Sequence, residues 1–190
     1  MLRRNSLLLL FFALCFFSCA STQNIQTANN NLSFEITLPS SLSSEQLDGR
    51  LLLLIANNDE KEPRFQLSDG PNTQLAFGID VENFGSNQTA TFDATAFGYP
   101  LKSITEIPKG EYYVQALLNV YETFNRADGH IVKLPADNGE GQKWNRSPGN
   151  VYSTPEKILI DPTQNTTIKI ALDQEIPAIE PPKDLSLIHI

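Results

Sequence analysis

The clearest alternation of apolar and polar positions lies between Glu111 and Glu122. The even positions carry apolar or aromatic side chains, namely Tyr112, Val114, Ala116, Leu118 and Val120. Successive side chains of a strand point to opposite faces, so this period of two predicts a strand whose even face meets a core. The odd face mixes polar, apolar and aromatic residues, and we expect it to be solvated or to carry a binding surface.

Turn signals frame this strand on both sides. Pro108 and Gly110 precede it, and Asp128-Gly129 follows it. Glycine adopts positive φ at little cost, so Asp128-Gly129 favours a hairpin turn, with Ile131–Leu134 on the returning strand.

Further strands follow from the same pattern on both sides of this region. The candidates are Leu32–Leu38, Arg50–Ala56, Phe65–Leu67, Gln74–Val81, Gln88–Phe92, Ile104–Ile107, Lys157–Ile160 and Thr167–Leu172. The unbroken apolar run Arg50–Ala56 predicts a strand covered on both faces, with a helical turn as the alternative. Gly78 within the fourth candidate indicates a bulge or a close backbone approach.

These seven to nine short strands, with turn residues between them and no amphipathic helix, predict an all-β sandwich with one long polar loop. Tyr112, at the start of a strand after Pro108 and Gly110, resembles a tyrosine corner or the related turn of transthyretin-like sandwiches. The expected class is therefore an immunoglobulin-like or transthyretin-like β-sandwich.

The first residues have a different composition. Arg3-Arg4 precede an apolar run from Leu7 to Phe17, which is shorter than the roughly 20 residues of a membrane span and fits a secretory signal peptide. Cys19 follows Ser18 and resembles the lipidated cysteine of bacterial lipoproteins. This resemblance implies acylation of Cys19, with ordinary signal cleavage or a retained anchor as alternatives, and the Ala20 after it resembles the outer-membrane pattern of Gram-negative lipoproteins.

The expected organisation has four parts. Residues 1–18 form the signal peptide, residues 19–31 a lipidated cysteine and flexible tether, and residues 32–176 the β-sandwich domain. Residues 177–190 form a proline-rich linker and the start of a following domain, because three prolines between Pro177 and Asp184 are succeeded by a new apolar stretch. A chain with this pattern is expected to continue.

The composition of the chain limits the kinds of partner that it can bind. The 190 residues carry a formal charge of −8 and no basic cluster beyond Arg3-Arg4, which argues against nucleic-acid binding. The two cysteines, Cys15 and Cys19, both lie in the amino-terminal segment, so the folded part has neither a disulfide nor a thiolate metal site. We expect no cofactor and a membrane attachment through lipid.

No catalytic motif is present in the sequence. A G-x-S-x-G elbow and an H-E-x-x-H pair are both missing, and His130 and His189 are the only histidines. A small hydrolase using His130 with an unidentified serine is therefore the weakest of three hypotheses.

The remaining candidates for ligand binding lie in the long polar loop and on the strand before it. Trp144, the single tryptophan, either stacks on a sugar ring or anchors the loop, and Tyr113, Tyr121 and His130 would complete a ligand-binding surface. Asp137–Glu140 is oxygen-rich and leaves calcium open, although EF-hand spacing is absent. No metal ligand is assigned.

The central stretch resembles a known family. The residues that carry the resemblance are Gly110–Ala116, Tyr121–Phe124, Asp128–His130, Lys133–Pro135, Gly139–Gln142, Trp144-Asn145, Pro148–Asn150 and Tyr152-Ser153. They resemble the β-rich amino-terminal region of bacterial envelope esterases, whose catalytic domain is of the α/β-hydrolase class. The resemblance covers roughly Gly49 to Asp184 and implies that a hydrolase domain follows, so no catalytic residue is carried over to this chain.

Two main hypotheses follow. The first is a non-catalytic β-sandwich domain of an exported lipoprotein, in the cell envelope and at the outer membrane of a Gram-negative bacterium, accessory to an esterase domain absent from this chain. The second is a stand-alone glycan-binding envelope lipoprotein that uses the aromatic residues of the long loop.

Overall fold

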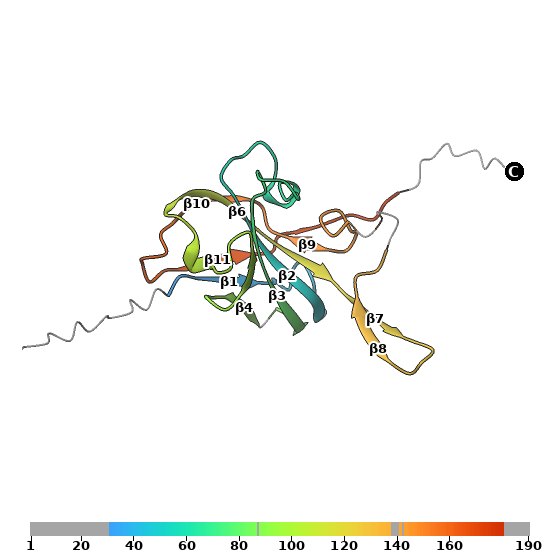
Figure 1. The fold of residues 1–190 in the computed structure, drawn as a ribbon. Coiled ribbons are helices and arrows are strands. Elements are labelled where there is room, and N and C mark those ends of the chain that lie inside the picture. The colour runs from blue at the N-terminus through green and yellow to red at the C-terminus, as the bar shows by residue number, and fades with distance from the viewer. Residues whose placement is uncertain (1–30, 87, 138–140, 142, 181–190) are drawn as a thin grey trace, which may run out of the picture.

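The structure is a computed structural model, and it describes residues 31–86, 88–137, 141 and 143–180. Two β-sheets enclose one core, and a separate hairpin projects from one end of the body (Figure 1). The described residues therefore confirm the predicted all-β sandwich. The predicted signal peptide, Cys19, all but the last residue of the predicted tether, and His189 lie outside the described residues.

The smaller sheet has three strands in the order β11-β1-β4. They span Thr167–Ala171, Ser33–Thr37 and Thr89–Phe92. The central strand, β1, alternates as its sequence predicts, with Phe34 and Ile36 fully buried between polar neighbours. It pairs in parallel with β11 and antiparallel with β4, and the second pairing places Phe34 opposite Phe92.

The larger sheet has the order β12-β9-β6-β2-β3-β5, and β10 also pairs with β6. Its strands are β2 Leu47–Ala56, β3 Leu75–Phe84, β5 Phe97–Tyr99, β6 Gly110–Val120, β9 Val151–Tyr152, β10 Glu156–Ile160 and β12 Gln174–Glu175. β10 pairs with the first half of β6, whereas β9 pairs with Leu117 and Leu118 in its second half. Ser153 lies between β9 and β10 and bonds Ala116 through both its amide and its hydroxyl.

The core forms where the inner faces of the two sheets meet. Phe34, Ile36 and Phe92 of the smaller sheet pack with Leu51, Leu53, Ile55, Phe77, Val114 and Leu118 of the larger one. The even face of β6 therefore meets a core, as predicted. The run in β2 is a strand covered on both faces, because Leu54 and Ala56 are also buried although they face away from this core.

The odd face of β6 was expected to be solvated or to carry a binding surface, and the first alternative is wrong from Gln115 onward, although Glu111 is exposed. Gln115, Leu117 and Asn119 are all buried, Gln115 completely. The 3-10 turn η1, Pro63–Phe65, and the loop 143–150 cover this face, and their contacts are described below.

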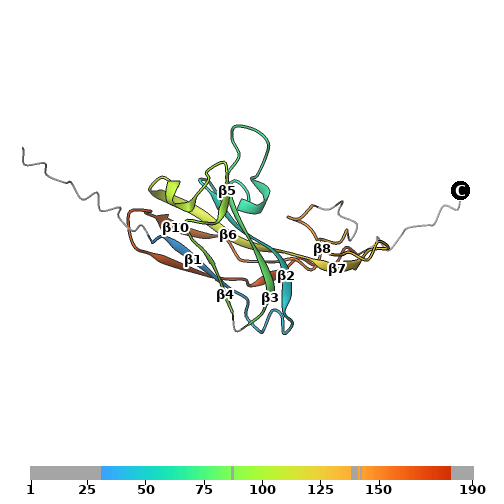
Figure 2. The same cartoon turned by 60° about the horizontal axis from the view of Figure 1, so that its bottom comes forward.

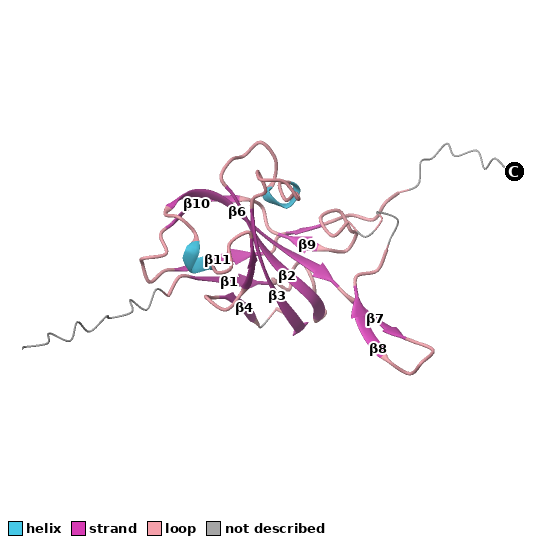
Figure 3. Cartoon of the chain, viewed as in Figure 1, coloured by secondary structure: helices cyan, strands magenta, loops and turns pink. Residues whose placement is uncertain are grey.

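Two further local predictions need correction. Phe65–Leu67 is not a strand, because Pro63 begins a 3-10 turn. Ile104–Ile107 likewise contains the 3-10 turn η2, Ile104–Glu106, which Ser103 caps by accepting from Thr105 N. These two turns are the only helical elements among the described residues (Figure 3), and none of these residues forms a helix long and apolar enough to span a membrane.

Gly78 marks a close approach and not a bulge, because its register with Leu52 is continuous. The guanidinium of Arg50 lies across it, donating to the Gly78 carbonyl at 3.1 Å and pairing with Asp80 at 2.9 Å. A Cβ on Gly78 would lie only 2.7 Å from Arg50 Nε, which explains the missing side chain.

The predicted Asp128-Gly129 turn is confirmed in a hairpin formed by β7, Glu122–Asn125, and β8, Ile131–Leu134. Gly129 has a φ of 84°, which glycine tolerates. The hairpin points away from the sandwich in both views (Figures 1 and 2). Lys133 Nζ ties it to the body through Asp48, at 2.9 Å.

Candidate functional site

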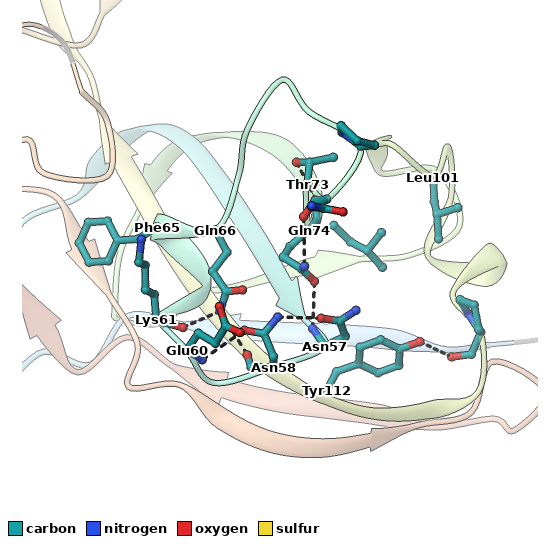
Figure 4. A pocket seen from close by; sticks show the side chains of 14 residues that line it. Asn57, Asn58, Glu60, Lys61, Phe65, Gln66, Thr73, Gln74, Leu101 and Tyr112 are labelled. Carbon is teal, nitrogen blue, oxygen red and sulfur yellow. Dashed lines mark hydrogen bonds between the residues drawn. The ribbon is translucent and has the colours of Figure 1, made fainter.

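A polar cleft of about 710 Å³ lies at one end of the larger sheet (Figure 4). The connection from β2 to β3 and the segment between β5 and β6 form its walls. Its lining residues are Asn57, Asn58, Glu60, Lys61, Phe65, Gln66, Pro71, Asn72, Thr73, Gln74, Leu75, Leu101, Pro108 and Tyr112.

Amide side chains hold the β2–β3 connection in shape. Gln74 Oε1 accepts from Asn57 N at 3.0 Å, and Asn57 Oδ1 accepts from Asn58 Nδ2 at 2.8 Å. Gln66 Nε2 donates to the carbonyls of Asn58 and Lys61, at 3.1 and 2.6 Å. The loop is therefore braced by its own side chains, as the dashed lines of Figure 4 show.

The same bracing leaves amide atoms open. Asn57 Nδ2, Gln66 Oε1 and the side-chain amide of Asn72 make no hydrogen bond to any other described residue. The cleft thus offers both donors and acceptors on neutral groups. The only charged lining residues are Glu60 and Lys61, whose opposite charges are both exposed.

The apolar part of the cleft is the edge of the core. Leu75, Leu101 and Tyr112 are half-buried and pack against the core residues. Tyr112 Oη donates to the Pro108 carbonyl four residues upstream, at 2.9 Å, which confirms the predicted tyrosine-corner geometry. Burial raises the pKa of Tyr112, so its hydroxyl stays protonated as this donation requires.

Trp144 begins the loop that covers the odd face of β6. Its side chain is half-buried, and its carbonyl accepts from Asn150 Nδ2 at 2.7 Å. Asn150 is buried and also bonds Asn119 Oδ1 and Val120 N. These contacts hold the loop down through the Trp144 carbonyl and the Asn150 side chain. They involve no atom of the indole ring, so the choice between stacking and anchoring for Trp144 stays a prediction.

A second set of contacts joins this loop to η1. Asn145 Nδ2 donates to the Arg64 carbonyl at 3.1 Å, and Arg64 Nη1 donates to the Asn145 carbonyl at 3.4 Å. The Arg64 guanidinium also lies 3.9 Å from the centre of the Tyr152 ring and 4.5 Å from that of Phe65. A cation held between two aromatic faces and paired with Glu62 is well satisfied although it is buried.

Gln115, on β6, connects η1 and the segment after β9 to the larger sheet. Its Nε2 donates to Glu62 Oε2 and to the Ser153 carbonyl, both at 2.9 Å, and its Oε1 accepts from Arg64 N at 3.1 Å. We call Gln115, Glu62, Arg64, Asn145 and Ser153 the buried polar network. Both N–H groups and the oxygen of the Gln115 side chain bond protein groups, and the side chain is fully buried, so it is not available to a ligand.

The structure does not bring the four expected ligand-binding residues together. Tyr113 and Tyr121 are eight residues apart along an extended chain, which separates them by about 26 Å. Tyr113 Oη donates to Asp59 Oδ2 at 3.0 Å, and this bond raises its pKa. Burial, and then the charge of Asp80, raise the pKa of Tyr121.

His130 lies in the turn of the projecting hairpin. It is 76% exposed, and its Nδ1 lies 3.2 Å from Asp128 Oδ1. Asp128 is its only side-chain partner within the described ranges. The geometry therefore gives no support to a serine–histidine pair at His130, and a role for His130, Tyr113, Tyr121 or Trp144 in binding stays a prediction.

The calcium prediction falls largely outside the described residues, because Asn138–Glu140 belong to the part not described. Among the residues that are described, no group of three or more His, Cys, Asp or Glu is placed to hold a metal ion.

Sequence reasoning missed the cleft. Its signal is the density of amide side chains between Asn57 and Gln74. An amide-rich loop and a braced amide-lined cleft have the same composition, so the pattern alone does not separate them.

Comparison with known proteins adds no relative. No family model, no curated protein and no solved structure matches this chain. The fold and the cleft define it as a β-sandwich protein with an amide-lined cleft.

Proposed function

We propose that this chain is the accessory β-sandwich domain of an exported lipoprotein, attached to the envelope through Cys19 and positioning an esterase domain that follows it. The motif resemblance, the secretory pattern of residues 1–18 and the proline-rich linker motivate the proposal.

The observation that carries it is where the chain enters and leaves the sandwich. β1 begins at one end of the body, and the chain leaves after β12 at the opposite end in both views (Figures 1 and 2). A domain anchored at its amino-terminal side would therefore hold a following domain on the side away from the membrane.

The exit point is firmly fixed. Ile176 is buried, its amide donates to the Asn150 carbonyl at 2.8 Å, and its carbonyl accepts from Gly149 N at 2.9 Å. From Pro177 to Glu180 every residue is exposed. The body thus ends at Ile176, and the linker starts from a rigid point, which favours a positioning role.

The projecting hairpin offers a contact surface at the same end. Phe124 and Leu134 lie on one face of it, and they are 40% and 52% exposed. Lys133 is on the opposite face and reaches back to Asp48. Exposed apolar side chains beside the exit point are suited to a following domain.

Two measurements test the proposal. Palmitate labelling and membrane fractionation should show lipidation that Cys19→Ser abolishes. In the protein extended past Ile190, hydrogen exchange of the hairpin amides should be slower than in the 190-residue chain. Equal exchange in the two, or hydrolysis of a short-chain aryl ester by the 190-residue chain well above a heat-denatured control, would contradict the proposal.

A further inference from the structure

The amide-lined cleft has chemistry that a spacer does not need. Its open groups are one donor at Asn57 Nδ2, one acceptor at Gln66 Oε1 and the complete amide of Asn72. An anion would find no cationic cluster there, since Lys61 is offset by Glu60. A ligand that donates and accepts through neutral groups matches this lining, and sugar hydroxyls do both.

The cleft also provides apolar surface. Leu75 and Leu101 line it, and they suit the C–H faces of a sugar ring. Phe65 and Tyr112 also line it, and their rings add aromatic surface.

The size of the cleft is suitable. Its volume of about 710 Å³ lies within the range of about 300–1,000 Å³ that is usual for small-molecule sites. The bracing by Gln74 and Gln66 fixes the loop without a ligand, so little ordering is required on binding.

We propose that this cleft binds a neutral oligosaccharide, with Asn57, Gln66 and Asn72 bonding hydroxyl groups and Leu75 and Leu101 packing against a ring. The domain would then hold a glycan near whatever it positions. This site is separate from the loop of Trp144, and it does not depend on lipidation or on a following domain.

The test is a titration of the chain, without its first 19 residues, with cellohexaose, xylohexaose, mannohexaose and maltohexaose. Binding is followed by calorimetry and by the side-chain amide signals in NMR spectra. At least one glycan should bind and shift the Asn57 and Asn72 signals. Loss of one neutral hydrogen bond should weaken binding about two- to tenfold in Asn57→Ala and in Asn72→Ala.

Asn125→Ala is the matched control. Asn125 is also an exposed asparagine whose side chain makes no hydrogen bond to the described residues, but it lies on the hairpin. It should leave the affinity unchanged. Asn72→Ala removes only an exposed amide, so it should not affect folding. No binding of any of the four glycans, binding that both cleft variants leave unchanged, or binding only of an uncharged extended peptide would overturn the proposal.

Discussion

Gln115 is the residue whose replacement tests the buried polar network most directly. Gln115→Leu keeps the approximate volume of the side chain but removes all three of its hydrogen bonds. Two of the abandoned partners are main-chain groups of buried residues, Arg64 N and Ser153 O. The third, Glu62 Oε2, is part-buried and keeps its bond to Arg64 Nε.

The size of the effect follows from these two orphaned groups. A buried polar group left without a partner costs about 1–3 kcal/mol, so Gln115→Leu should lower the free energy of unfolding by about 2–6 kcal/mol. Domains of this kind are stable by about 5–15 kcal/mol, so the loss is a large fraction of the total. The network also holds the loop of Trp144 through Asn145, so the loop should loosen as well.

Urea titration followed by far-UV circular dichroism measures the global change. Fluorescence of Trp144, the single tryptophan, reports on the loop, and its emission should shift to longer wavelength in Gln115→Leu before the main transition. Gln164→Leu is the matched control, because Gln164 is exposed and its side chain bonds no described residue. It should change stability by less than about 0.5 kcal/mol. If Gln115→Leu were equally mild, the network would not be what fixes the loop.

Two further predictions concern the larger sheet and the pH dependence of stability. Gly98→Ala should lower the free energy of unfolding by at least about 2 kcal/mol, because the added Cβ would meet the backbone of the turn after β5. Gly78→Ala should lower it less, because the flexible end of the Arg50 side chain can move away. Urea titrations of the two variants measure the difference. The hydrogen bond from Lys109 is the main cause that lowers the pKa of Asp161 from 3.8 to about 2 in the folded protein. The stabilising contribution of Asp161 is therefore complete above pH 4 and is lost as the pH falls toward 2. Asp161→Asn should flatten this part of the stability–pH curve, and an unchanged curve would refute the assignment.

The strands were predictable where alternation runs for five residues or more. In β1 and β6 the period of two identifies the core face, because one face of each strand must be buried. β9 and β12 have two residues each and β5 has three, too few for any periodicity. Their pairing is decided by neighbours distant in sequence, so the sequence pattern did not reveal them.

The covered face of β6 was not predictable for a related reason. Gln115 meets Arg64, which is 51 residues earlier in the chain, and Asn119 meets Asn150, which is 31 residues later. A glutamine in a strand has the same sequence signature whether it faces water or a buried partner. The residue type at position 115 is therefore compatible with either a solvated or a buried side chain. The fold of the connecting segments, which brings Arg64 and Ser153 to Gln115, decides that it is buried.

The contrast between Gln115 and Asn57 decides where on this molecule a ligand is to be sought. Both are amide side chains of the larger sheet region, Gln115 on the interior strand β6 and Asn57 directly after β2, but Gln115 is fully buried and bonded through both its oxygen and its nitrogen. Asn57 uses only its oxygen for the structure of the loop, and its Nδ2 faces the cleft. A polar group that already bonds protein at every site can contribute to stability but not to recognition. The described segment 143–150 covers the sheet through such satisfied groups, whereas the amides between β2 and β3 include groups that bond no described residue.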